Sequence, residues 1–487
     1  MAGNRTRVRL VISVLATLVI LAPLAWLWQS SLVAKSYSVM EMGYLDYGGG
    51  PVGSHDHTST DRSITDLVVK EAPEADVRVD LVAEQRNLAI GGRSVAGYTV
   101  NGTSPGPTIT AHQGELVEVH VRNASVRDGL SMHWHGYDVP AAMDGVAGVT
   151  QDEVPIGSEF TYRFVANQVG TYWYHSHQVS HEQVIGGLFG TLIVLPKAGG
   201  SDAVDVIATA HTYAGTKTIN GVAGDLQVPA KPGERVRVRV INTDNGPIET
   251  WADVPFRVLA IDGYQINAPT EVTDRSVTVT AGGRADLGVT MPSDGKGVRV
   301  QVSKGTAVVL GASAPPPPPP QPAASLDLLS YGSPSALSFD PAKADRRFDY
   351  SIGRRPGFVR GRPGLWWSIN GHLYPNVPMY VVRDGDVVIM HIDNHSGEVH
   401  PMHLHGHHAV VLARNGVAAT GSPWWFDSLN VLEGETYDIA FVATNPGIWL
   451  DHCHHLKHAA DGMVAHLMYE GVSTPYRIGG TPDNQPE

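Results

Sequence analysis

Histidine is the residue whose number and spacing could do chemistry in this sequence. The chain of 487 residues contains 23 histidines, and six pairs of them are separated by one residue. About one such pair is expected by chance. Because side chains alternate between the two faces of a strand, each pair presents both imidazoles on one face, where they can bind metal. The pairs are His55/His57, His133/His135, His175/His177, His403/His405, His405/His407 and His452/His454.

Four of the pairs form two groups that are far apart in the sequence. The first group is SMHWHG with YWYHSHQ, and the second is HPMHLHGH with DHCHHLKH. If strands from the two groups face each other, eight imidazoles point into one space, which is too many ligands for one ion. They predict a cluster of several ions, for which copper, zinc, iron and nickel are candidates. The eight residues are His133, His135, His175, His177, His403, His405, His452 and His454.

The single cysteine makes copper the specific candidate. Cys453 is followed by His458 and Met463 in the spacing C-x4-H-x4-M, and His400 precedes a His-x-His pair with the opposite strand parity. Two histidines, one thiolate and a weak axial methionine are the ligand set of a blue-copper electron-transfer site. Cys453 also lies between the two histidines of its own pair, so the backbone offers a short electron path to the predicted cluster.

Together these motifs resemble the copper-binding motifs of the multicopper oxidases, the laccase-like family of three cupredoxin domains, in its bacterial type. The resemblance spans about residues 78–475. It is carried by HWHG at 133–136, HSH at 175–177, HPMHLHGH at 400–407 and HCHHLKHAADGM at 452–463.

The resemblance implies four copper ions: one of type 1, one of type 2 and a type 3 pair. Type 1 copper would be held by His400, Cys453, His458 and Met463. Type 2 copper would be held by His133 and His403. The type 3 pair would be held by His135, His175, His177, His405, His452 and His454.

The activity that the resemblance implies is one-electron oxidation of a small reducing substrate at type 1 copper, coupled to reduction of O2 to water at the three other coppers. Cuprous-oxidase relatives tend to carry Met-rich loops, whereas the 11 methionines here are dispersed. Phenols or aromatic amines are therefore the expected donors. The alternatives are a cuprous or ferrous metallo-oxidase in copper homeostasis and a non-enzymatic extracytoplasmic copper-binding protein.

Proton delivery is the point at which the sequence departs from the family pattern. Many family members have an acid three or six residues after the ligand cysteine, where this chain has Leu456 and Ala459. Asp144, in MDGV, resembles the family's other acid near the cluster and is the residue expected to relay protons. The alternative is an aspartate that only forms a turn with Gly145.

Several histidines are not expected to bind metal. His407, His408 and His455 adjoin predicted ligands but break the family pattern, so they are expected in supporting or surface positions. His181 lies outside the HSH motif, and the pair His55/His57 is explained by chance.

The elements that must position the ligands are strands. Several segments alternate apolar and polar residues, are separated by Gly, Pro, Asn and Asp turns, and indicate stacked antiparallel sandwiches. With the resemblance, they predict an all-β chain of three consecutive cupredoxin-like Greek-key β-sandwich domains. The predicted strands include 115–122, 159–165, 235–241, 276–280 with 285–289, part of 380–392, and 436–442.

One low-complexity segment and a second boundary divide the chain. Six consecutive prolines favour a polyproline II linker over 313–324, and KAGGSD at 197–202 indicates a second boundary. The predicted domains are 75–197 with cluster ligands, 203–312 without copper ligands, and 325–475 with type 1 and cluster ligands; a flexible arm over 30–74 precedes them and a C-terminal tail over 476–487 follows.

The N-terminus is a membrane-targeting segment. Arg5, Arg7 and Arg9 precede a run without charge from 10 to 28, and no clean cleavage pattern follows it. Residues 1–29 are therefore expected to form an uncleaved anchor, with a cleaved signal peptide as the alternative. Either way the body lies on the extracytoplasmic face or is secreted. The net charge of −13 makes the chain a poor partner for nucleic acid.

Overall fold

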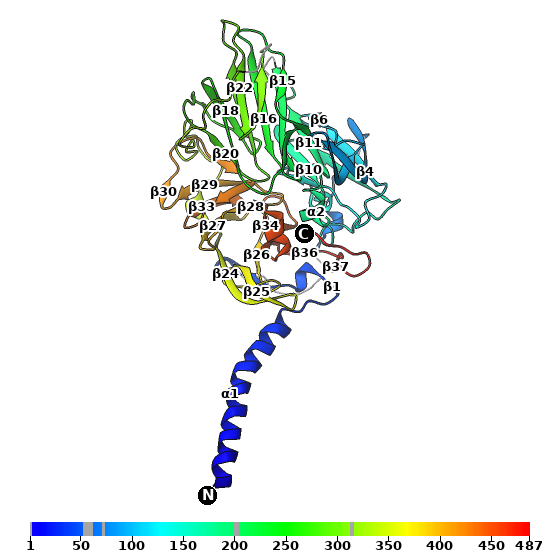
Figure 1. Cartoon of the computed structure of the whole chain (residues 1–487), viewed down its shortest axis with the longest axis vertical. Helices are drawn as coiled ribbons and strands as arrows, with labels where there is room; N and C mark the ends of the chain where they lie inside the picture. Colours follow the sequence, from blue (N-terminus) through cyan, green and yellow to red (C-terminus); the bar gives the residue numbers. More distant parts are fainter. Residues whose placement is uncertain (1, 52–61, 71–73, 199–203, 312–315) are drawn as a thin grey trace.

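The computed structural model describes residues 2–51, 62–70, 74–198, 204–311 and 316–487. Strands dominate these residues, and three β-sandwiches follow one another along the chain (Figure 1). We refer to them as the first, second and third sandwich. The predicted all-β fold of cupredoxin-like sandwiches is confirmed. Figure 1 also shows that the C-terminus lies between the first and third sandwiches, beside the helix α2 (Ser180–Gln183).

The first sandwich packs a sheet of order β5-β4-β7-β9 against one of order β6-β11-β10-β8. Its strands are β4 (Val77–Ile90), β5 (Arg93–Val100), β6 (Ile109–His112), β7 (Leu116–Asn123), β8 (His133–His135), β9 (Glu159–Val165), β10 (Gly170–His175) and β11 (Phe189–Leu195). β8 pairs with β10, and His133 lies opposite His175. This register brings two His-x-His motifs together on one sheet. The short 3-10 helix η3 (Ala141–Met143) follows β8.

The second sandwich has sheets of order β14-β13-β12-β16-β21-β18-β19 and β15-β23-β22-β17-β20. Its strands are β12 (Val204–Tyr213), β13 (Thr216–Ile219), β14 (Val222–Ala223), β15 (Leu226–Val228), β16 (Arg235–Asn242), β17 (Ile248–Ala252), β18 (Phe256–Ile261), β19 (Tyr264–Gln265), β20 (Val277–Val279), β21 (Arg284–Thr290), β22 (Val298–Ser303) and β23 (Thr306–Leu310). The described part of the proline-rich linker lies along this sandwich, because Arg299 Nη1 donates to the Pro316 carbonyl at 3.3 Å and Ser276 N donates to the Ala324 carbonyl at 3.2 Å.

The third sandwich has sheets of order β2-β26-β35-β34-β28-β32 and β25-β24-β27-β33-β29-β30. Its main strands are β24 (Arg346–Val359), β25 (Arg362–Ile369), β26 (Pro378–Val382), β27 (Val387–Asn394), β28 (His400–Leu404), β29 (Ala409–Arg414), β30 (Val417–Ala418), β31 (Trp425–Phe426), β32 (Ser428–Val431), β33 (Thr436–Val442), β34 (Ile448–Cys453) and β35 (Val464–Tyr469). The 3-10 helix η4 (Pro341–Lys343) precedes β24, and α3 (Leu456–Ala460) follows β34. β28 pairs with β34, and His403 lies opposite His452.

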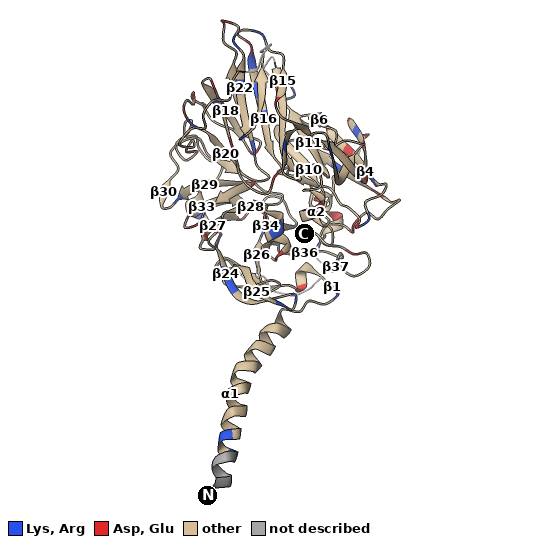
Figure 2. Cartoon of the chain, in the orientation of Figure 1, with Lys and Arg blue, Asp and Glu red and all other residues tan. Residues whose placement is uncertain are grey.

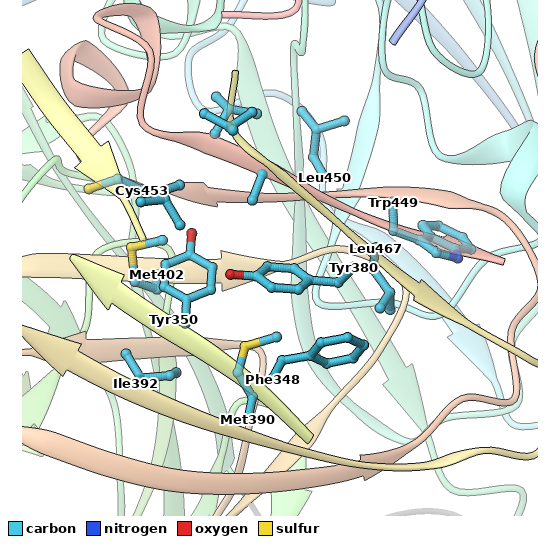
Figure 3. Close-up of a cluster of buried hydrophobic side chains, with 14 of the residues drawn as sticks. Phe348, Tyr350, Tyr380, Met390, Ile392, Met402, Trp449, Leu450, Cys453 and Leu467 are labelled. Atoms are coloured by element: carbon cyan, nitrogen blue, oxygen red, sulfur yellow. The ribbon is translucent and has the colours of Figure 1, made fainter. Parts of the chain in front are cut away.

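The core of the third sandwich holds the strand that carries the cysteine. Figure 3 shows Tyr350 and Tyr380 side by side in this core, with Phe348 and Trp449 nearby and Cys453 at one end of the cluster. All five side chains are buried. Burying a large apolar side chain contributes roughly 1.5–3 kcal/mol, so this packing holds β34 firmly in place.

The segment over 30–74 is predicted to be a flexible arm. Where the structure describes it, this segment pairs with strands of the body, so the prediction was wrong for these residues. β1 (Ser36–Tyr37) pairs with β37 (Ile478–Gly479), β2 (Tyr44–Asp46) with β26, and β3 (Arg62–Ser63) with β36 (Val472–Ser473). Val39 in η1 (Val39–Glu41) and Ile64 in η2 (Ile64–Asp66) are fully buried. Unpaired backbone groups on neighbouring strands bind the arm, which its Gly-rich composition does not reveal. His55 and His57 lie outside the described residues.

The helix α1 (Ala2–Ser30) projects from the body (Figure 1). Its stretch Arg7–Ser30 is long and apolar enough to cross a membrane, and none of that window is buried against the protein. The helix lies near the N-terminus, where a signal sequence has the same length and apolar composition, so these two properties fit both a signal sequence and an anchor.

Candidate metal centre

Strand pairing gathers the eight predicted cluster histidines into two sets, one in the first and one in the third sandwich. The two sets meet where these sandwiches pack together. β8 and β10 supply one set, and β28 and β34 with the residues that follow them supply the other. All eight side chains are at most 1% exposed. None of these eight residues belongs to the second sandwich.

The eight histidines are close together, and their distances allow more than one grouping, since His133 also groups with His403 and His405 and with His135 and His175. One grouping consists of two triads and a pair. Ring nitrogens of His177, His405 and His452 lie within 4.8 Å of one another. The rings of His135, His175 and His454 have centroids 4.8–5.6 Å apart.

The remaining two, His133 and His403, bring their Nε2 atoms within 3.5 Å of each other. Two triads and one pair are an arrangement that can hold three metal ions close together.

The imidazoles are oriented so that nitrogens are left for metal. His175 Nδ1 donates to the Ser176 carbonyl at 3.0 Å and His177 Nδ1 to the Pro486 carbonyl at 2.8 Å, while the Nε2 atom of each has no hydrogen-bond partner. Neither ring nitrogen of His454 has a partner. Buried polar atoms are normally hydrogen-bonded, so these free nitrogens fit a metal cluster.

Burial also sets the protonation state of the cluster. It lowers the pKa of His454 to about 3. For most of the other cluster histidines, burial holds the pKa well below its usual value. Neutral imidazole is the form that binds metal, so the residues present fit copper in both geometry and charge.

A second group of ligand atoms surrounds the cysteine. Cys453 Sγ lies 3.5 Å from His400 Nδ1 and 3.7 Å from His458 Nδ1, and the two ring nitrogens are 3.3 Å apart. Met463 is fully buried, and its carbonyl accepts from the Cys453 backbone N–H at 3.2 Å. Burial raises the pKa of the Cys453 thiol, so a cation is needed to hold it as thiolate. The structure thus brings together two imidazoles and a thiol that fit one soft metal ion.

Asp144 lies between two cluster histidines. Its Oδ2 accepts from His405 Nδ1 at 3.0 Å, its Oδ1 lies 3.1 Å from His133 Nδ1, and its carbonyl accepts from the same His133 nitrogen at 2.9 Å. The side chain is 1% exposed. Gly145, which follows Asp144, has a φ of 75°, a left-handed conformation that favours glycine. Asp144 leaves Nε2 of both imidazoles free to face the cluster.

Asp427 is a buried acid at the cluster that sequence reasoning missed. Its carbonyl accepts from His403 Nδ1 at 2.9 Å, and its Oδ1 lies 3.2 Å from His135 Nε2. Arg284, from the second sandwich, binds both carboxylate oxygens at 2.6 and 2.7 Å. Burial alone would raise the pKa of Asp427, but the Arg284 guanidinium holds it well below its usual range. The second sandwich therefore supports the cluster without supplying a predicted ligand.

The last residues of the chain also reach the cluster, which the sequence did not indicate. Pro486 accepts from His177, and Glu487 Oε1 lies 3.4 Å from His452 Nδ1. Ser180 Oγ donates to the other Glu487 oxygen at 3.1 Å, and the glutamate side chain is 5% exposed. Burial raises the pKa of Glu487 to about 8. The predicted C-terminal tail is thus part of the wall of the site.

One edge of the cysteine site faces solvent. The His458 side chain is 11% exposed, and its Nε2 lies 3.6 Å from Glu398 Oε2. Trp367 packs against the His458 ring with centroids 4.4 Å apart, and His455 stacks on it at 3.8 Å. Glu398 is 45% exposed and also pairs with Arg354 at 3.2 Å. An electron donor can therefore approach His458 beside the Glu398 carboxylate and the Arg354 guanidinium, while the buried Trp367 ring supports the imidazole from inside.

The histidines that were not expected to bind metal have other contacts. The His407 ring bonds the Tyr469 hydroxyl at 2.7 Å, and His408 lies 3.3 Å from both Asp138 and Asp427. His181 is partly exposed near Glu182, and His455 stacks on His458 as described above.

Two family models described as multicopper oxidase match residues 82–199 and 341–471. The chain is 29% identical to a laccase of Botryotinia fuckeliana, with 83% of each chain covered, and 28% identical to the multicopper oxidase MmcO of Mycobacterium tuberculosis, with 81% of this chain and 87% of the relative covered. Among solved structures, Fet3p, a multicopper oxidase that functions in iron import, superposes with a TM-score of 0.70 at 20% identity, covering 81% of this chain and 90% of Fet3p.

Proposed function

Since this chain belongs to the multicopper oxidases, oxidoreductases that use O2 and four copper ions, we propose that it is a laccase-like oxidase whose donors are phenols or aromatic amines. The observation that carries the choice of donor is the exposed edge of His458. It is flanked by the Trp367 ring and the Glu398 carboxylate. A laccase among the similar proteins supports this proposal.

We assign the ligands as the resemblance to the multicopper oxidases implies, and the distances allow this assignment. His400, Cys453, His458 and Met463 would hold type 1 copper, and His133 and His403 type 2 copper. The type 3 pair would be held by one triad of His177, His405 and His452 and another of His135, His175 and His454. When bound, the four copper ions supply stepwise electron transfer from the donor to O2.

The chain's own groups define the donor site. A phenol O–H or an aromatic N–H can donate to the exposed Glu398 carboxylate, while the buried Trp367 ring packs against His458 and holds it in place. The first electron then has a short covalent path, because Cys453 lies next to His452 and His454 in the backbone.

A ferrous or cuprous oxidase is the second candidate, since Fet3p, which functions in iron import, is among the similar structures. A metal ion at the donor edge would use Glu398 as a ligand. Arg354, however, is paired with Glu398 and lies over the Trp367 ring at 4.0 Å. This pairing occupies the Glu398 carboxylate and compensates its charge, so Glu398 is a weaker ligand for a metal cation, which supports organic donors.

The donor test compares turnover on a phenol, an aromatic amine, Fe(II) and Cu(I), measured as O2 uptake by the copper-loaded protein. We expect the organic donors to be used and Fe(II) and Cu(I) to be poor. The variant Glu398→Gln should raise KM for phenol several-fold with a smaller effect on kcat, because it weakens docking only. Selective turnover of Cu(I) would reverse the ranking, and bound copper without any O2 uptake would favour the non-enzymatic copper-binding protein.

We further propose that Asp144 carries protons to the cluster as well as orienting His133 and His405. Asp144→Asn should lower the rate of O2 reduction about 100-fold, the usual scale of general acid–base catalysis, while reduction of type 1 copper by the donor stays fast. Stopped-flow absorbance separates the two steps. Asp438→Asn, on an aspartate that is 44% exposed, is the matched control. Unchanged reoxidation by O2 in Asp144→Asn would contradict the relay.

For localisation, we propose that α1 stays attached as an N-terminal anchor. Arg7 and Arg9 then remain on the cytoplasmic side, and the sandwiches lie on the extracytoplasmic face. Release as a secreted protein is the alternative.

A further inference from the structure

We propose that the hairpin of β24 and β25 rests on anionic lipid headgroups beside the anchor. We call residues 353–367 the basic hairpin. This inference rests on the proposal that α1 remains in the membrane. It adds an interaction surface and its partner, a lipid bilayer with negative headgroups.

The tip of the basic hairpin touches the end of the anchor helix. The Gly361 backbone N–H donates to Ser31 Oγ at 3.2 Å, and Asn376 Nδ2 donates to the Ser30 carbonyl at 3.5 Å. A cavity between helix and hairpin is lined by Trp26 and Leu27 on one side and by hairpin residues on the other. The hairpin tip therefore lies at the level where the membrane-spanning stretch ends, as Figure 1 shows.

The charge of the basic hairpin is opposite to that of the whole chain. Its sequence GRRPGFVRGRPGLWW contains four arginines and no acid, in a chain with a net charge of −13. Arg354 is neutralised by Glu398, whereas Arg355, Arg360 and Arg362 are exposed. Figure 2 shows basic residues on this hairpin next to the end of α1. Basic groups near a membrane surface are attracted to anionic lipids.

Apolar side chains accompany the arginines. Leu365, near the tip, is 59% exposed, and in the anchor Trp26 and Trp28 are 69% and 44% exposed. Tryptophan at the end of a membrane-spanning helix is typical of the membrane–water interface. An exposed leucine among arginines fits the boundary between headgroups and acyl chains better than it fits a water-facing surface. Charge, apolar exposure and the contact with α1 therefore identify the same partner.

The test uses the full chain in nanodiscs and an environment-sensitive fluorophore at position 365. The only native cysteine is buried, so L365C can be labelled selectively with nitrobenzoxadiazole. We expect brighter, blue-shifted emission in nanodiscs that contain phosphatidylglycerol, and less change in pure phosphatidylcholine. V417C is the matched control, because Val417 is 63% exposed on β30, outside the basic hairpin.

Charge is tested in the labelled chain by replacing Arg355, Arg360 and Arg362 with Gln. Each replacement should weaken the preference for anionic lipid about fivefold, and added salt should weaken it too. Emission at 365 equal to that at 417 would overturn the proposal while leaving the anchor intact. A chain that fails to enter nanodiscs would overturn both the anchor and the docking. O2 uptake is measured in parallel and is expected to be unchanged in all of these variants.

Discussion

Deletion of the last three residues, Gln485 to Glu487, is expected to weaken copper binding at the type 3 pair and lower turnover about 10–100-fold. Pro486 and Glu487 contact the Nδ1 atoms of His177 and His452, and both histidines belong to one triad of the type 3 assignment. Without these partners, each ring is free to rotate or to change its protonated nitrogen. Supporting contacts of this kind usually affect metal affinity on that scale.

The measurement combines copper analysis with the near-ultraviolet absorption of the type 3 pair, and the blue colour of type 1 copper reports whether the rest of the protein is intact. Glu487→Gln removes the negative charge but keeps the size of the side chain. Its amide oxygen still accepts from Ser180, so this variant should retain most of the copper. Asp483→Asn, on an exposed side chain of the same segment, is the control. A deletion variant with full copper content and normal turnover would show that the C-terminal contacts are not needed.

Replacement of Cys453 by Ser is expected to abolish both the blue colour and O2 uptake with every donor. The thiolate is the soft ligand that selects and colours type 1 copper, and a serine hydroxyl does not replace it. The thiolate would also connect type 1 copper to the backbone that continues into His452 and His454, so its loss takes away the electrons' route from the donor to the cluster. Copper analysis should give about three ions per chain instead of about four.

Met463→Leu is the matched comparison for Cys453→Ser, because both side chains are fully buried in the same core. The leucine variant should keep its colour and raise the type 1 potential, since an axial ligand is lost without loss of the thiolate. Turnover in Cys453→Ser that persists with type 1 copper absent would contradict the assigned electron route.

The strands and the metal ligands could be predicted because each depends on a pattern of residues close together in the sequence. Period-two alternation predicted strands 159–165 and 436–442 with the bounds that β9 and β33 have. The ligands could be proposed because each pair is only two residues apart on a strand. The groups that support them come from elsewhere: Asp427 is held by Arg284 across sandwiches, and Glu487 reaches His452 from the chain end. No local spacing encodes such contacts, because they exist only after the sandwiches pack.

The docking of the arm was missed for a related physical reason. β1 and β3 are two residues long, too short for any alternation to be visible, and their stability comes from strands to which they are distant in sequence. Glu398 at the donor edge carries no motif either. Its proposed role in binding the donor rests on its distance from His458, and only the folded chain defines that distance.

The join between α1 and the body has a consequence for where the enzyme can work. The helix ends at Ser30, and the first strand that ties the arm to the sandwiches begins at Ser36. If α1 anchors the protein as proposed, a single proteolytic cut between these two residues would detach the anchor and leave the described contacts of the copper centre in place. One gene product could then serve as a tethered catalyst that meets donors at the cell surface and as a diffusing catalyst that reaches donors in the surrounding medium.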